Sequence, residues 1–85
     1  MSTAVGTNEA ETAKQIAGIF RDVLGADTAP AADSEFLAIG GDSITAARAV
    51  SLIRSRFGVR VTVRDLFRTK SAAGLAAVVH TRRDG

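Results

Sequence analysis

The stretch between Asp42 and Gly58 constrains the fold most strongly, because it has the pattern of an amphipathic helix with defined ends. On a helical wheel, one apolar face spans an arc of about 100°, and it consists of Ala46, Ala49, Val50, Ile53 and Phe57. Asp42 is of a type preferred at a helix N-cap, and glycine is preferred just past a helix end. We therefore predict a helix over residues 43–57 that packs this face into a core.

Another helix is predicted near the N-terminus, followed by a long connection. Asn8 and Glu11 have the spacing of a capping box, and Gly25 is a natural stop. Between them, apolar residues recur at helical spacing: Ile16, Ile19, Phe20, Val23 and Leu24. Residues 25–42 then form a loop. The second part of the loop should attach to the core through Phe36, Leu37 and Ile39.

Two further helices are predicted in the last third of the chain. Thr62 and Asp65 have capping-box spacing, which predicts a short helix over residues 63–68. Ser71 is a suitable N-cap for a fourth helix, one face of which carries Leu75, Val78 and Val79. The predicted fold class is all-α: a four-helix bundle of three longer helices and a short third helix, with a long loop between helices 1 and 2.

Length and composition exclude several classes of protein. Eighty-five residues make one small domain, which leaves little room for a deep active-site pocket. The chain has no cysteine and a single histidine, so a disulfide framework, a thiolate metal site and a histidine metal cluster are excluded. That histidine, His80, is expected to be solvated or lightly packed. We expect a folded domain over residues 8–82 with flexible ends at residues 1–7 and 83–85.

The N-terminal residues lack the basic and apolar blocks of a signal peptide, and no apolar run approaches membrane-spanning length. We therefore expect a soluble, cytoplasmic monomer that binds no metal and contacts no membrane. The first and last residues fit either a free-standing protein or a domain of a longer one.

Charge is distributed unevenly along the chain. Residues 1–42 contain two basic and seven acidic residues, whereas residues 43–85 contain nine basic and two acidic ones. The second half could therefore meet an acidic cofactor, an acidic protein or nucleic acid. A small helical nucleic-acid-binding domain is a remote alternative, because the arginines of the second helix do not gather on one stripe and aromatic residues are few.

Ser43 follows Gly40, Gly41 and Asp42 at the point where the loop becomes a helix. Two glycines leave the serine without bulky neighbours on one side, and the N–H groups of a helix N-terminus suit a phosphate. The plain alternative is a glycine turn with an aspartate cap. A nucleophile elbow is disfavoured because the closing glycine and a βα scaffold are missing, and a phosphate-binding P-loop is excluded because no Gly-Lys-Ser/Thr follows.

A second face of the helix over residues 43–57 lies beside Ser43 and points away from the core. It carries Ile44, Ala47, Arg48 and Ser51. Ile44 is a large apolar residue predicted to be exposed, which makes this face a candidate contact surface, although isolated apolar residues on a surface are common.

The sequence around the serine resembles the peptidyl carrier (thiolation) domains of nonribosomal peptide synthetases. The resemblance rests on residues 33–44, Asp-Ser-Glu-Phe-Leu-Ala-Ile-Gly-Gly-Asp-Ser-Ile, on residues 54–59 with Val61, on Asp65-Leu66-Phe67 and on residues 71–76. It covers about residues 10–80 in order and at the family's spacing. One departure is Leu37, where the family often has the second member of an aromatic pair.

The resemblance implies a four-helix bundle whose serine, here Ser43, receives 4′-phosphopantetheine from coenzyme A, with Gly40, Gly41 and Asp42 forming its surroundings. A separate phosphopantetheinyl transferase, which needs magnesium, would attach the arm. The arm's thiol would then carry aminoacyl or peptidyl groups as thioesters. The chain would have no catalytic residues of its own, which agrees with the absence of cysteine.

The resemblance also implies partners: adenylation, condensation, thioesterase or tailoring enzymes that contact the second helix, the loop before it and the third helix. Besides Ile44, Ala47, Arg48 and Ser51, the contact candidates are Leu37 and Ala38 in the loop and Val63 and Arg64 at the third helix. Phe67 is assigned to the core rather than to a contact.

Charge separates the subclasses of carrier. Acyl carrier proteins of fatty acid synthesis resemble this fold but have a strongly acidic second helix. Residues 43–64 here contain no acid and five arginines: Arg48, Arg54, Arg56, Arg60 and Arg64. Like charges across an interface are costly, which favours a peptidyl carrier. An acyl or aryl carrier of a polyketide or hybrid pathway and a docking module with an unmodified serine are the alternatives.

Overall fold

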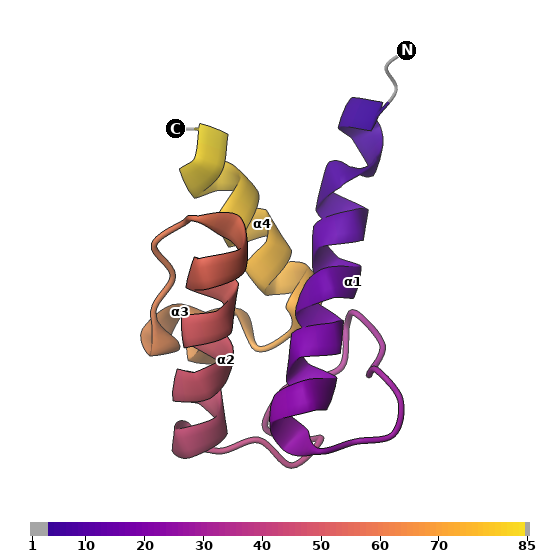
Figure 1. The fold of residues 1–85 in the computed structure, drawn as a ribbon, viewed down its shortest axis with the longest axis vertical. Coiled ribbons are helices and arrows are strands. Elements are labelled where there is room, and N and C mark those ends of the chain that lie inside the picture. Colours follow the sequence, from indigo (N-terminus) through magenta and orange to yellow (C-terminus); the bar gives the residue numbers. More distant parts are fainter. Residues whose placement is uncertain (1–3, 85) are drawn as a thin grey trace.

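The computed structural model describes the backbone of residues 4–84 and the side chains of residues 9–83. Four helices follow one another along the chain (Figure 1): α1 Ala4–Leu24, α2 Ser43–Phe57, α3 Val63–Thr69 and α4 Ala72–Asp84. The described residues form no strand beyond one isolated bridge between Glu35 and Ser71. The predicted all-α fold with a long loop before α2 is confirmed. None of the described helices is both long and apolar enough to cross a membrane.

The predicted ends of α2 are confirmed, and those of α3 are within one residue. Helix α3 starts at Val63 as predicted and ends one residue later than expected, at Thr69. The start of α1 near Asn8 was wrong, because α1 begins at Ala4. Adding a turn to an existing helix costs far less than nucleating one, so a local cap signal does not fix the first residue. Of the ends expected to be flexible, residues 1–3 and 85 lie outside the described part.

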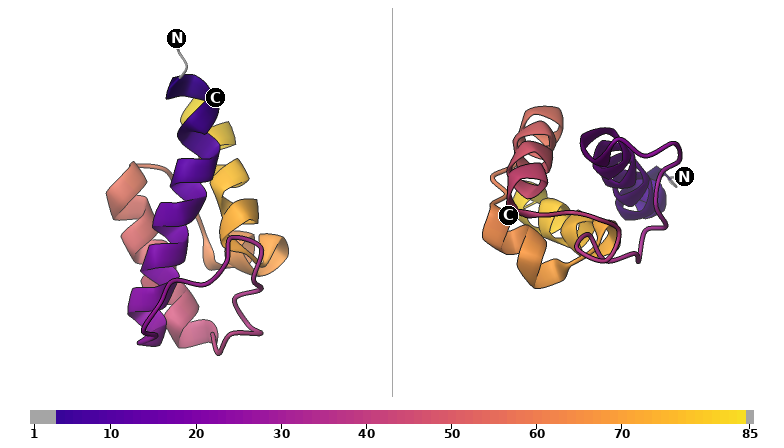
Figure 2. Two further views of the ribbon diagram at one scale, coloured as in Figure 1. Left: turned by 90° about the vertical axis from the view of Figure 1, so that its right-hand side faces the viewer. Right: turned by 90° about the horizontal axis from the view of Figure 1, so that it is seen from below.

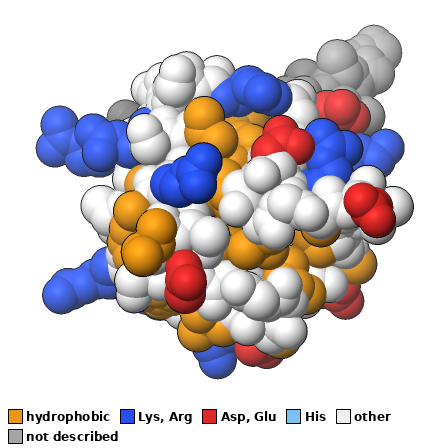
Figure 3. Space-filling model, turned by 60° about the horizontal axis from the view of Figure 1, so that its bottom comes forward, with side chains coloured by type: hydrophobic (Ala, Val, Ile, Leu, Met, Phe, Trp, Pro, Cys, Tyr) orange, Lys and Arg blue, Asp and Glu red, His pale blue; other side chains and the backbone are white. Residues whose placement is uncertain are grey.

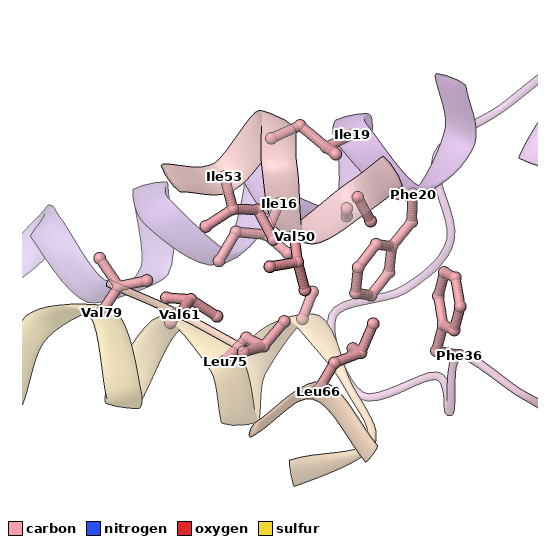
Figure 4. Close-up of a cluster of buried hydrophobic side chains, with 14 of the residues drawn as sticks. Ile16, Ile19, Phe20, Phe36, Val50, Ile53, Val61, Leu66, Leu75 and Val79 are labelled. Carbon is pink, nitrogen blue, oxygen red and sulfur yellow. The ribbon is translucent and has the colours of Figure 1, made fainter. Parts of the chain in front are cut away.

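The core lies between α1 and the other three helices (Figure 4). Its largest fully buried side chains come from all four helices and the connecting segments: Phe20, Phe36, Ile16, Ile53, Leu66, Leu75, Val61 and Val79. The predicted apolar face of α2 is buried at four positions, and its fifth member, Phe57, is partly buried against the core. Full burial of such a side chain contributes roughly 1.5–3 kcal/mol, so this face fixes α2 in the bundle.

The loop over residues 25–42 lies over the lower half of α1 in Figure 2 and is attached through Phe36. The Phe36 ring is buried and its centroid lies 4.7 Å from that of Phe20. The Phe36 backbone N–H donates to the Lys70 carbonyl at 2.7 Å, and the Ala73 N–H donates to the Ala32 carbonyl at 2.8 Å. Leu37 was also expected to pack on the core, but it is 58% exposed because neighbouring residues of this turn point in different directions.

Asp65 ties α3 to α4. Its side chain is only 5% exposed and accepts hydrogen bonds from the guanidinium groups of Arg82, with Nη2 at 3.1 Å, and Arg68, at 3.0 Å. It also accepts from the backbone N–H of Thr62 at 2.9 Å, which completes the predicted capping box. Arg82 Nη1 donates further to the Arg60 carbonyl at 2.8 Å. A buried carboxylate therefore fixes the orientation of the short helix.

Different helix ends lie at the two ends of the bundle. Helix α2 begins at the lower end of Figure 1, while α1 begins and α4 finishes at the upper end. The molecule is elongated, with a longest extent of 38 Å. Ser43, the first residue of α2, thus lies at one end of the long axis, away from the start of α1 and the end of α4.

Candidate functional site

Ser43 is the first residue of α2 and is exposed. Asp42 precedes it in an extended conformation, and its Oδ1 accepts a hydrogen bond from the Thr45 N–H at 2.9 Å. The Thr45 hydroxyl oxygen in turn accepts from the Asp42 N–H at 2.8 Å. Hydrogen bonds from Thr45, first from its backbone, hold the pKa of Asp42 below its usual value. This reciprocal cap fixes the backbone on both sides of Ser43 and leaves its hydroxyl free of a role in the cap.

The two glycines before Asp42 are required for different reasons. Gly40 has φ +104°, a conformation that residues with a side chain rarely adopt. A Cβ on Gly41 would lie 2.2 Å from a carbon of the Phe36 ring, far inside contact distance. The Gly41 N–H also donates to the Phe36 carbonyl at 3.0 Å. The turn that presents Ser43 is thus packed directly on the buried aromatic ring.

The surroundings of Ser43 fit a phosphodiester. Ser43 is exposed at the N-terminus of a fifteen-residue helix, where the helix dipole favours negative charge. On the loop side, no atom beyond the neighbouring residues in the chain lies within 4 Å of the place where a Cβ of Gly40 would be, so this side of the turn is open. Asp42 is the one acid in residues 40–64, and its carboxylate is turned into the cap.

The predicted contact face of α2 is on the surface. Ile44 is 72% exposed, and Ala47, Arg48 and Ser51 are exposed as well. In the loop, Leu37 and Ala38 are exposed too. Figure 3, which brings the lower end of the molecule forward, shows several apolar areas on this side, with most lysine and arginine side chains toward its edges. Ile44 is therefore an exposed large apolar side chain directly beside Ser43, as the helical spacing predicted.

Some of the contact residues predicted on α2 and α3 lie side by side in the structure. Ala47 and Ser51 of α2 and Val63 of α3 line one shallow groove of about 350 Å³. Val63 is half-buried and packs on the core, whereas Arg64 is exposed. Phe67 also packs on the core but is only half-buried. The groove therefore joins the two helices at the level of the second turn of α2.

Some features of this region were not predicted from the sequence. Leu52 is a further exposed apolar residue of α2, at 46% exposure. A cavity of about 210 Å³ lies between the loop and α3. Away from this region, His80 on α4 is half-buried, in line with the expectation of a solvated or lightly packed residue, and its Nε2 lies 2.9 Å from the Thr12 hydroxyl oxygen. The described residues contain no group of three or more histidines and acids arranged to hold a metal ion.

Comparison with known proteins gives a consistent result. Residues 14–79 match the family described as "Phosphopantetheine attachment site". The chain is 39% identical over 70 residues to phosphinothricin tripeptide synthetase PhsC of Streptomyces viridochromogenes, covering 82% of this chain and 6% of that protein. It is 44% identical over 71 residues to the nonribosomal peptide synthetase easA of Emericella nidulans, covering 80% of this chain and 1% of that protein. The chain thus spans a small fraction of these curated relatives.

Solved structures share the fold. BlmI, a type-II acyl-carrier-protein from Streptomyces verticillus involved in bleomycin biosynthesis, superimposes with a TM-score of 0.84 at 27% identity, covering 92% of this chain and 93% of that one. A chain from the complex of the phosphopantetheine transferase Sfp with coenzyme A and a peptidyl carrier protein gives 0.75 at 27% identity, covering 84% and 91%. The chain belongs to the phosphopantetheine attachment family, whose members carry this group covalently, and it is a carrier protein domain of the kind found in nonribosomal peptide synthetases.

Proposed function

We propose that Ser43 is the attachment point for 4′-phosphopantetheine. The observation that carries this proposal is the exposed Ser43 at the capped N-terminus of α2, on a turn that is open at Gly40 and packed on the Phe36 ring at Gly41. Asp42 and Thr45 form the hydrogen bonds of the helix cap with each other, so the cap does not use the side chain of Ser43. The remaining exposed serines of α2, Ser51 and Ser55, lie farther along the helix, away from this turn.

Loading is a phosphoryl transfer in which this chain is the acceptor. The Ser43 oxygen forms a bond to the β-phosphorus of coenzyme A, the pyrophosphate P–O bond breaks, and adenosine 3′,5′-bisphosphate leaves. The serine proton passes to a base of the transferase, which also holds the magnesium ion, because the carboxylate of Asp42 beside Ser43 is engaged in the helix cap. The described acids nearest in sequence are Asp42, which is engaged in the cap, and Glu35.

The chain's own task is then to present the arm and to be recognised. When bound, the arm supplies a thiol that carries an aminoacyl or peptidyl group as a thioester. The exposed face with Ile44 and Arg48, together with the groove between α2 and α3, is the surface we assign to the partners. These are a phosphopantetheinyl transferase and the adenylation, condensation, thioesterase or tailoring enzymes of nonribosomal peptide synthesis. The chain acts as their substrate and not as a catalyst.

The test is the intact mass of the apo protein after incubation with coenzyme A, magnesium and a broad-specificity transferase. The wild type is expected to gain one phosphopantetheine and Ser43→Ala none. Ser55→Ala, an exposed serine on the same helix, is the matched control and should load fully. Loading of the Ser43→Ala variant, or no loading of the wild type by several such transferases, would overturn the proposal.

A further inference from the structure

A cavity of about 210 Å³ lies between the loop before α2 and the third helix. Its walls are mostly apolar and come from two segments that are distant in sequence: Glu35, Phe36, Leu37, Leu66, Phe67 and Lys70. Leu66 and Phe36 are part of the core, while Leu37 is exposed and Phe67 half-buried. The cavity therefore opens from the surface onto the edge of the core.

The backbone around this cavity is fixed from both sides. The N–H of Phe36 donates to the carbonyl of Lys70, and Glu35 forms a bridge with Ser71. Lys70 has φ +72° and is the one described residue other than glycine with positive φ. Such a conformation costs of order 1–3 kcal/mol and persists where the surroundings hold it. The walls are thus held in place without a bound partner.

The cavity suits a small apolar group with a positively charged group next to it. A cavity of roughly 150 Å³ lined by aliphatic and aromatic side chains accommodates benzene, so a ring or a branched aliphatic side chain fits here. Glu35 is an exposed acid at the rim, and its carboxylate forms no ion pair with a described residue. An ammonium group next to the apolar group would complement it, and Lys70, the other charged residue that lines the cavity, can donate to a carbonyl oxygen.

The cavity is also close to Ser43. The Phe36 ring, which forms one wall, lies directly under Gly41, two residues before the serine. Phosphopantetheine is comparable in length to about four or five extended residues, roughly 15 Å or more. A group at the end of such a tether has a high effective concentration around its anchor. The tethered cargo therefore meets this cavity far more often than any free molecule does.

Resting on the attachment of the arm to Ser43, we propose that this cavity binds the cargo: the apolar side chain of an aminoacyl group enters between Phe67 and Leu37, and its free α-ammonium pairs with Glu35. An N-acylated or peptidyl group lacks that ammonium and is bound less well. Chain elongation on the α-nitrogen would then release the cargo from the cavity.

The test uses apo protein loaded by a broad-specificity transferase with an amide analogue of leucyl-coenzyme A, which does not hydrolyse. Nuclear magnetic resonance should show close contacts between the leucyl methyl groups and the Phe67 ring, and shifts that an acetyl-loaded arm does not produce. Glu35→Gln should lower occupancy about two- to fivefold, the range of an exposed ion pair. Asp33→Asn, another exposed acid of the loop, is the matched control. N-acetyl-leucyl cargo should be insensitive to Glu35→Gln.

The absence of contacts between the leucyl group and Phe67 in loaded wild type would overturn the proposal. Equal occupancy for leucyl and N-acetyl-leucyl cargo would overturn the pairing with Glu35. Changes at Phe67 that require an added partner enzyme would overturn it as well and assign the cavity to a side chain of the partner. Failure of the arm to attach is seen separately in the intact mass and concerns the proposed function alone.

Discussion

Replacing Asp65 with asparagine tests the link between α3 and α4 most directly. The carboxylate is buried, and asparagine keeps its size but removes the charge that faces Arg82 and Arg68. Breaking a buried ion pair by removing one partner costs about 3–5 kcal/mol. Because both guanidinium groups are partly exposed and can be hydrated, we expect a smaller loss, roughly 2–3 kcal/mol. In a domain of this size that lowers the unfolding temperature by about 10–20 °C.

The loss should depend on pH in a definite direction. The hydrogen bond from Arg82, and to a lesser degree those from Thr62 and Arg68, holds the pKa of Asp65 well below its unfolded value of 3.8. A carboxyl whose pKa is lowered by folding stabilises the protein above its unfolded pKa and loses this contribution as the pH falls. The stability difference between wild type and Asp65→Asn should therefore be full at pH 7 and shrink below about pH 4.

Urea unfolding followed by circular dichroism between pH 2.5 and 7 measures this difference. Asp27→Asn, an exposed acid of the loop, is the control and should stay within about 0.5 kcal/mol of the wild type. Arg82→Gln should weaken the protein less than Asp65→Asn, and the double variant should lose little more than Asp65→Asn alone. The role of the Asp65 carboxylate would be refuted if wild type and Asp65→Asn differed in unfolding free energy at pH 7 by less than the scatter of the control. It would also be refuted if that difference grew as the pH was lowered.

Three further predictions concern the site. Gly41→Ala should destabilise the folded protein by about 1–3 kcal/mol in urea unfolding, because the added Cβ overlaps the Phe36 ring. Gly18→Ala, in the open middle of α1, is the control and should stabilise the protein by up to about 1 kcal/mol. Equal effects of the two substitutions would contradict the packing of Gly41 on Phe36. Asp42→Ala removes the α2 cap and should lower the unfolding midpoint by a few degrees, which calorimetry would show; an unchanged midpoint speaks against the cap. Ile44→Ser should lower the kcat/KM of loading by the transferase about tenfold while the circular dichroism spectrum stays unchanged. Leu52→Ser, the control, should leave this kcat/KM unchanged. Equal kcat/KM values for the two variants would show that Ile44 is not part of the interface.

The elements of this fold were predictable wherever the signal is local. Helix α2 follows from Asp42, Gly58 and the apolar residues between them, all of which act within one or two turns. The capping box of α3 and the cap of α4, where Ser71 Oγ accepts from the Gly74 N–H at 3.2 Å, are local in the same sense. Exposure of Ile44 followed from helical spacing alone. The first residue of α1 did not follow, because helix ends are set by small free-energy differences.

The features that were missed depend on contacts between distant residues. The need for glycine at position 41 comes from Phe36, whose ring direction the sequence does not reveal. Asp65 was predicted only as part of a cap, since its pairing with Arg82 joins residues 17 apart on different helices. The cavity at Phe67 has the same origin, because its two walls meet only once the loop is attached to the end of α3.

The position of Ser43 at one end of a 38 Å long body makes the whole domain a lever. The start of α1 and the end of α4 lie at the other end, so a linker attached there would leave Ser43 at the far tip of the body. A tilt of about 30° around this attachment point moves Ser43 by about half the length of the body. With the proposed arm on Ser43, the reach of the carried group would be the sum of the tilt of the body and the length of the arm. Immobilisation through either terminus should leave that reach intact.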